Sequence, residues 1–186
     1  MKKIKIIIIS LALIIFLYLI HFDLFRWIQL HNCIIWNENG KTTFKDFEAK
    51  PDNTSEMNLV FYHGFYLYSS PFNKPKVIAF FDRDESWVKD TTKFNFRELL
   101  KMQQIAFNLT EVYTRKCNAE IKKKGYDKNG NQKSFDYLTR IKDSVTAEYY
   151  SVKNQMLNED NKSANELINY WKPKVDDMLK AQKNYR

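Results

Sequence analysis

The sequence predicts an α+β domain, with a few-stranded antiparallel sheet followed by three helices, behind an apolar N-terminal helix. Two stretches, 59–68 (LVFYHGFYLY) and 76–81 (KVIAFF), are rich in the β-branched and aromatic residues that favour strands. From residue 96 onward, apolar residues instead recur at intervals of three and four, which is typical of helices with one buried face. Strands followed by a run of helices indicate an α+β domain rather than an alternating α/β one.

Length and composition exclude several classes of protein. The chain has 186 residues, of which 44% are hydrophobic and 16% aromatic, enough for one domain with a core, so wholesale disorder is excluded. With only 4 Gly, 4 Pro and 2 Cys, the chain is neither collagen-like nor a disulfide-dense mini-domain. The formal charge of +8 is spread among acidic residues without a concentrated basic stripe, so we expect no nucleic-acid partner.

The N-terminus carries an uncharged apolar run, Ile6–Ile20, behind a basic start. Its length suits both a signal-peptide core and a short membrane-spanning helix. The residues that follow, as far as Trp27, are bulky and lack a small-residue cleavage site. We therefore expect an uncleaved signal anchor that contacts the membrane through residues 6–22. The lysines before it predict a single-pass protein of the inner (cytoplasmic) membrane, with a cytoplasmic N-terminus and a periplasmic or extracellular C-terminal domain.

Three parts of the chain are expected: the signal anchor (1–22), a juxtamembrane segment (23–35) and a folded domain (36–186). Within the folded domain, an extended piece at 42–47 precedes the two strands. The segment 69–75, which contains two prolines, predicts the loop between the strands.

Three helices are expected in the C-terminal half. The first begins with Asn95 as N-cap, has Glu98 at capping-box spacing, and ends at Lys124 before Gly125. The second spans roughly 134–157. The third spans about 164–182, and a proline inside it, Pro173, predicts a kink or a late start.

The two cysteines leave an alternative open. In an oxidising compartment Cys33 and Cys117 could form one disulfide. They could equally remain two separate thiols, with Cys117 as a small apolar residue on a helix.

Three stretches together carry a resemblance to a known family. They are Trp36–Phe47 (WNENGKTTFKDF), Phe81–Val88 (FDRDESWV) and Leu99–Arg115 (LLKMQQIAFNLTEVYTR). In order and spacing they resemble a family of exported bacterial proteins of unknown function that look like zinc-dependent proteases. The family pattern has a Trp, a turn and a Trp/Phe-x-Asp-Phe segment, then a strand ending in Ser-Trp-Val, then a helix reading Leu-Leu-x-His-Glu-Gln-x-His-Phe-Asp-Ile. The resemblance covers about 36–124 and implies a small zincin-like domain.

The chain departs from this family at the residues that carry its chemistry. In a zincin helix, two His at i and i+4 bind zinc, and the Glu beside the first is the general base. The corresponding positions are Met102, Gln103 and Ala106, and the family's following Asp is Asn108. None of these side chains provides a strong zinc ligand or a base at neutral pH. The resemblance therefore implies a degenerate pseudo-metalloprotease, for which we expect no catalytic residue, no metal and no cofactor.

The leading hypothesis is a non-catalytic, membrane-anchored accessory or scaffold protein that binds another protein of the membrane or envelope. Its expected contact face comprises Glu111, Tyr113, Arg115 and Trp87. One alternative is a peptide- or envelope-polymer-binding module that uses the former substrate cleft. Another is a hydrolase with a relocated site that uses His63 and acidic residues; His63 with Glu111 or Asp46 is also the pair from which a different metal site could be formed.

Overall fold

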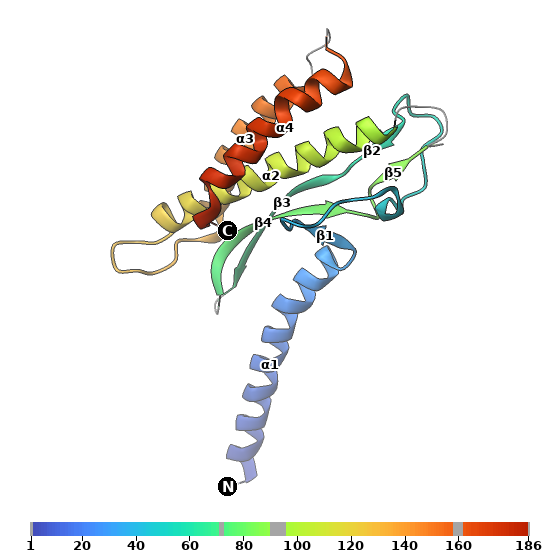
Figure 1. The fold of residues 1–186 in the computed structure, drawn as a ribbon. Helices are drawn as coiled ribbons and strands as arrows, with labels where there is room; N and C mark the ends of the chain where they lie inside the picture. Colours follow the sequence, from blue (N-terminus) through green and yellow to red (C-terminus); the bar gives the residue numbers. More distant parts are fainter. Residues whose placement is uncertain (1, 71–72, 90–95, 158–161, 186) are drawn as a thin grey trace. The chain divides into compact units, whose positions relative to one another are not determined.

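The first of the two units of the chain, Met1–Asn32, is a single helix. This helix, α1 (Lys2–Leu30), extends well beyond the apolar run and includes residues 23–30 of the expected juxtamembrane segment (Figure 1). The computed structural model describes residues 2–70, 73–89, 96–157 and 162–185. In α1, the described side chains from Ile4 to Tyr18 are all exposed.

No helix in the described ranges is both long enough and apolar enough to cross a membrane. The predictions of a signal anchor at 1–22 and of an inner-membrane localisation are therefore wrong. The physical reason lies in the length of the apolar run: Ile6–Ile20 is shorter than the about 20 residues that a span needs. Charged residues limit it on both sides, namely Lys5, Asp23 and Arg26.

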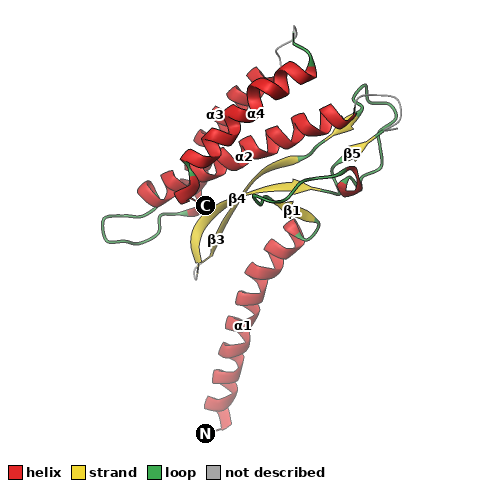
Figure 2. Ribbon diagram, in the orientation of Figure 1, coloured by secondary structure: helices red, strands yellow, loops and turns green. Residues whose placement is uncertain are grey.

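The second unit, Cys33–Arg186, has a three-stranded antiparallel sheet with helices on one side of it (Figures 1 and 2). The strand order is β1 (Cys33–Ile35), β4 (Asn73–Asp82) and β3 (His63–Ser70). A separate two-stranded ladder joins β2 (Leu59–Val60) to β5 (Trp87–Val88). The α+β class and the small antiparallel sheet are thus confirmed, but without the predicted membrane helix.

The strands differ from the prediction in detail. The stretch 59–68 is divided between β2 and β3, and 42–47 contains a 3-10 turn, η1 (Phe44–Asp46), instead of an extended piece. The expected loop at 69–75 is largely strand, and Pro75 lies inside β4. A proline fits there because β1 pairs with β4 only at residues 80–82, and the register between β3 and β4 shifts after Tyr68. Pro75 therefore lies where its missing N–H interrupts no regular ladder.

The three predicted helices are present as α2 (Phe96–Lys124), α3 (Phe135–Leu157) and α4 (Ala164–Ala181), followed by a 3-10 turn, η2 (Lys183–Tyr185). The predicted N-cap Asn95 lies outside the described residues. α2 ends where Gly125 donates its N–H to the Ile121 carbonyl. A Cβ atom at Gly125 would lie 2.5 Å from that carbonyl oxygen, so only glycine fits. α4 begins at its capping box, Ser163 with Glu166, and continues through Pro173 without a late start.

Two clusters of buried side chains form the core of the second unit. The larger joins α2 to α3, α4 and the inner face of β4, and its least exposed members include Leu109, Tyr149 and Trp171. The smaller is aromatic and lies between α2, the strands and the segment after β1, with members that include Trp36, Phe61, Phe81 and Phe107. α2 contributes to both clusters and is therefore the central element of the unit.

Candidate functional site

Two of the positions that the resemblance aligns with a zinc motif lie in the core. Met102 is 6% exposed and Ala106 is 1% exposed, while Gln103 is half-buried. Met102 and Ala106 belong to the same buried cluster as Trp171 and Val175 of α4. Because Met102 and Ala106 are buried in this cluster, their side chains are not open to a peptide or polymer.

Asn108, at the former Asp position, has a structural role together with Gln104 one turn earlier. The indole N–H of Trp36 donates to Asn108 Oδ1 at 2.9 Å. The backbone N–H and the hydroxyl of Thr42 both donate to Gln104 Oε1, at 3.1 and 2.9 Å. Gln104 Nε2 in turn donates to Asn108 Oδ1 at 3.2 Å. This amide pair fixes the segment after β1 against α2.

Glu111 and Arg115 form a buried ion pair one helical turn apart. Arg115 Nε donates to Glu111 Oε1 at 2.8 Å, and Nη1 donates to the carbonyl of Leu179 in α4 at 2.9 Å. The guanidinium carbon also lies 5.1 Å from the centre of the Trp36 ring. The pair therefore joins α2, α4 and the segment after β1.

The contact face predicted from the sequence is wrong for this reason. All four of its side chains are between 4% and 9% exposed: Glu111, Tyr113, Arg115 and Trp87. The charged residues among them satisfy each other inside the unit, so they do not reach a partner.

His63, the first residue of β3, lies between α2 and α3. Its Nδ1 lies 2.8 Å from Thr110 Oγ1, and its Nε2 lies 3.1 Å from Lys153 Nζ. Thr110 Oγ1 also contacts the Ala106 carbonyl at 3.0 Å and the Tyr149 hydroxyl at 3.2 Å. An ammonium group can only donate, so Nε2 is the acceptor and the neutral ring carries its proton on Nδ1.

The surroundings of His63 disfavour a second proton on the ring. Burial lowers the pKa of His63 to about 3, and the nearby charge of Lys153 adds to this effect. Burial also lowers the pKa of Lys153 and raises that of Tyr149. With a neutral imidazole, His63 accepts the hydrogen bond that Lys153 Nζ donates.

The relocated hydrolase site is not assembled among the described residues. Glu111 is held by Arg115, and Asp46 accepts hydrogen bonds from the N–H and hydroxyl of Thr43 at 2.7 and 2.9 Å. Neither carboxylate is hydrogen-bonded to His63, whose two ring nitrogens face Thr110 and Lys153. A histidine base needs a ring nitrogen that is available to an activated nucleophile, whereas here Nε2 already accepts from Lys153 and Nδ1 faces the buried Thr110.

The cysteines form no disulfide in this structure. Cys33 lies opposite Asp82 on the edge strand β1, and Cys117 is buried in α2. Burial raises the pKa of each thiol to about 12, and Asp82 adds to the effect at Cys33. Across the described ranges, no group of three or more His, Cys, Asp or Glu side chains is placed to hold a metal ion.

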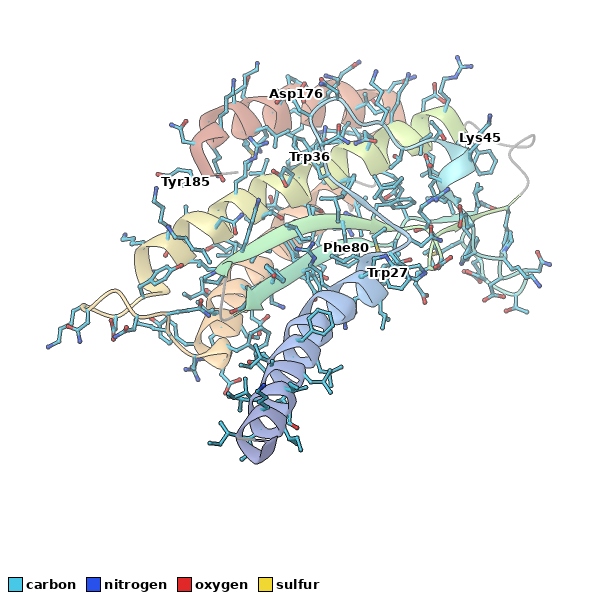
Figure 3. The ribbon with its side chains drawn as sticks, turned by 90° about the horizontal axis from the view of Figure 1, so that it is seen from below. Trp27, Trp36, Lys45, Phe80, Asp176 and Tyr185 are labelled. Atoms are coloured by element: carbon cyan, nitrogen blue, oxygen red, sulfur yellow. The ribbon has the colours of Figure 1, made fainter. Side chains whose placement is uncertain are left out.

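The feature that sequence reasoning missed is the face of the sheet turned away from α2, α3 and α4 (Figure 3). Val77, Ala79 and Phe81 of β4 point into the core, so the alternate residues point outward. We define the open sheet face by its apolar and aromatic residues, which are half-buried or exposed: Ile35, Tyr62, Tyr66, Tyr68, Ile78 and Phe80. The unbroken apolar run 77–81 is the sequence signal for a strand that is apolar on both sides. It does not show which residues of β3 lie on the same face, because that depends on the pairing of the strands.

No family model, no curated protein and no solved structure matches the chain. The resemblance to zinc-dependent proteases accordingly stays a prediction from its three sequence stretches.

Proposed function

We propose that the second unit is a non-catalytic protein-binding domain, which contacts a different protein through its open sheet face. The observation that carries the proposal is the composition of that face. An antiparallel sheet with one face on a core usually has polar residues on the other. Here Tyr66 and Ile78 are cross-strand partners in the middle of the outer side, and the exposed ring of Tyr62 lies 6.5 Å from that of Phe80.

A face of this kind fits protein recognition. Tyrosine and phenylalanine are enriched in protein–protein interfaces, where they provide a large contact area at low cost in side-chain entropy. Contiguous exposed apolar patches on a folded domain generally mark an interaction site. On this face Tyr62 is 51% exposed and Ile35 is 40% exposed.

The charges at one end of the face indicate the chemistry of the partner. Lys74 and Lys76 are exposed and alternate with inward-pointing residues, so they continue the row of Ile78 and Phe80 along β4. Among the described residues, neither lysine forms an ion pair. The partner surface that fits is therefore apolar in its centre, with carboxylates on one side.

The absence of catalysis is the second part of the proposal. The motif positions Met102 and Ala106 are filled core positions, and the cluster around His63 has no oriented base with a nucleophile. These observations favour binding over the two alternatives that the sequence left open.

Site-specific photo-crosslinking tests the proposal. A photoreactive benzoylphenylalanine placed at Tyr62 in the full chain, in the cells that produce it, is expected to give one discrete adduct with another protein. The matched control is Tyr170 on α4, which has the same exposure: 50% against 51% for Tyr62. Equal adducts at both positions, none at either, or only a dimer of the chain itself would contradict the proposal.

A further inference from the structure

β3 is an edge strand with an unusual composition. Its outer side has no neighbouring strand within the described chain, because the order of the sheet is β1, β4, β3. It is 8 residues long (HGFYLYSS) and contains no Lys, Arg, Asp, Glu or Pro. Natural proteins usually protect an edge strand by making it short, charged or interrupted by proline. From His63 to Tyr68 the outer edge of β3 has none of these protections and is suited to pairing with an added strand. Beyond Tyr68 the register with β4 shifts and Gln132 Nε2 donates to Ser69 Oγ at 2.7 Å, so the edge available for pairing is residues 63–68.

Beside this strand, α3 presents a row of three side chains at positions i, i+3 and i+7: Tyr150, Lys153 and Leu157. Tyr150 is 51% exposed and Leu157 is 46% exposed. The row lies on the β3 side of the helix, because Lys153 Nζ is 3.1 Å from Nε2 of His63 in β3. One turn earlier, Tyr149 contacts the inner side of the same strand, with its ring 5.0 Å from that of Phe65.

The charge of Lys153 is not neutralised by any described residue. Its hydrogen-bond acceptor is the imidazole of His63, which is uncharged, and no carboxylate of the described chain forms an ion pair with it. The side chain is half-buried. A cation in this setting binds a carboxylate more strongly than a fully exposed lysine does, because less water competes for it.

From this juxtaposition we infer that the partner contributes an extended segment, which pairs with the outer edge of β3 and places an Asp or Glu side chain on Lys153. The inference deepens the proposed function, since it rests on the second unit being a protein-binding domain. Backbone hydrogen bonds to β3 provide affinity that depends little on sequence. The carboxylate on Lys153 and apolar contacts with Tyr150 and Leu157 provide the register and the specificity.

A phage-displayed library of random 12-residue peptides, selected on the full chain, provides the probe. The enriched peptides are expected to alternate apolar and polar residues and to share one acidic position. Lys153→Met is expected to weaken their binding at least tenfold, as measured by fluorescence anisotropy, because it removes a charge-assisted hydrogen bond. The control Lys101→Met, at an exposed position of α2, is expected to leave binding unchanged.

N-methylation of the peptide backbone tests the pairing directly. Methyl groups on alternate residues are expected to abolish binding in one register and to leave it within threefold in the other, because only every second N–H of an added strand faces β3. Leu157→Lys is a second variant, which tests the same surface even if Lys153→Met disturbs folding. Leu157 is exposed, so its replacement is expected to leave the fold intact. It is expected to weaken binding at least threefold.

Several results would overturn the inference while leaving the proposed function intact. The first is that the selection enriches no peptide although Tyr62 crosslinks to a partner. The second is that peptide binding is insensitive to N-methylation in both registers. The third is that neither Lys153→Met nor Leu157→Lys weakens peptide binding. If Tyr62 gives no crosslink either, the proposed function fails as well.

Discussion

Replacement of His63 by glutamine is expected to remove part of the dependence of stability on pH. In the folded chain, the ring is uncharged and lies between Thr110 and Lys153. Protonation would place a second positive charge beside Lys153, among the rings of Phe61 and Phe107. Glutamine keeps hydrogen-bonding capacity but does not titrate, so the comparison isolates the proton on the imidazole.

The expected magnitude follows from the pKa of His63, which is about 3 in the folded chain against 6.5 for the unperturbed group. Between these values the unfolded chain binds one more proton than the folded chain. The free energy of unfolding therefore falls as the pH falls from 6.5 towards 3. Each pH unit in this window is worth about 1.4 kcal/mol, or about 2.7 kcal/mol at pH 4.5. His63 is only partly buried, so water reduces this contribution to about 1–2 kcal/mol.

Urea unfolding, followed by far-UV circular dichroism at fixed ionic strength from pH 4.5 to 7.5, measures the effect. The wild-type chain is expected to lose about 1–2 kcal/mol more than His63→Gln between pH 7 and 4.5. The control His31→Gln, at an exposed position of α1, should follow the wild type. Carboxylates contribute to acid sensitivity in every variant, so only the difference between curves is informative. Parallel curves for wild type and His63→Gln would refute the arrangement around the imidazole.

Two further predictions concern buried groups. Arg115→Met is expected to lower the free energy of unfolding by about 3–5 kcal/mol, because it removes the cation paired with the buried Glu111 carboxylate. The double variant Glu111→Gln/Arg115→Met should recover part of this loss in urea titrations, and a loss below about 1 kcal/mol would contradict the buried pair. Iodoacetamide at pH 8 is expected to alkylate Cys33 and Cys117 at least tenfold more slowly in the native chain than in urea, because burial raises both pKa values to about 12. Equal rates in the two states, measured by mass spectrometry, would show that the thiols are not protected.

The helices could be predicted closely from the sequence because their signals are local. The end of α2 follows from Gly125, and the start of α4 follows from the capping box at Ser163. β1 could not be predicted, because it has only 3 residues and is defined by its pairing with β4 rather than by its own composition. Pro75 misled for a related reason: whether a strand tolerates proline depends on its neighbours in the sheet.

The sequence predicts those properties of the candidate site that follow from the identity of single residues, but not the contacts between residues that are distant in the chain. That Met102 and Ala106 are poor zinc ligands follows from their residue types alone, and the structure places both side chains in the core. The prediction of the contact face was wrong because charged residues such as Arg115 were expected at the surface. Arg115 is instead buried, and its charge is paired with that of Glu111. The contact of Lys153 with His63 joins residues that are 90 positions apart, and no local pattern predicts such a pair.

The crosslink at Tyr62 is the decisive experiment, because it reports what lies on the open sheet face of the intact chain. We expect one discrete adduct with a different protein from Tyr62 and none from the equally exposed Tyr170. Equal labelling from the two positions, or no adduct from Tyr62, would contradict the claim that this face binds a protein partner.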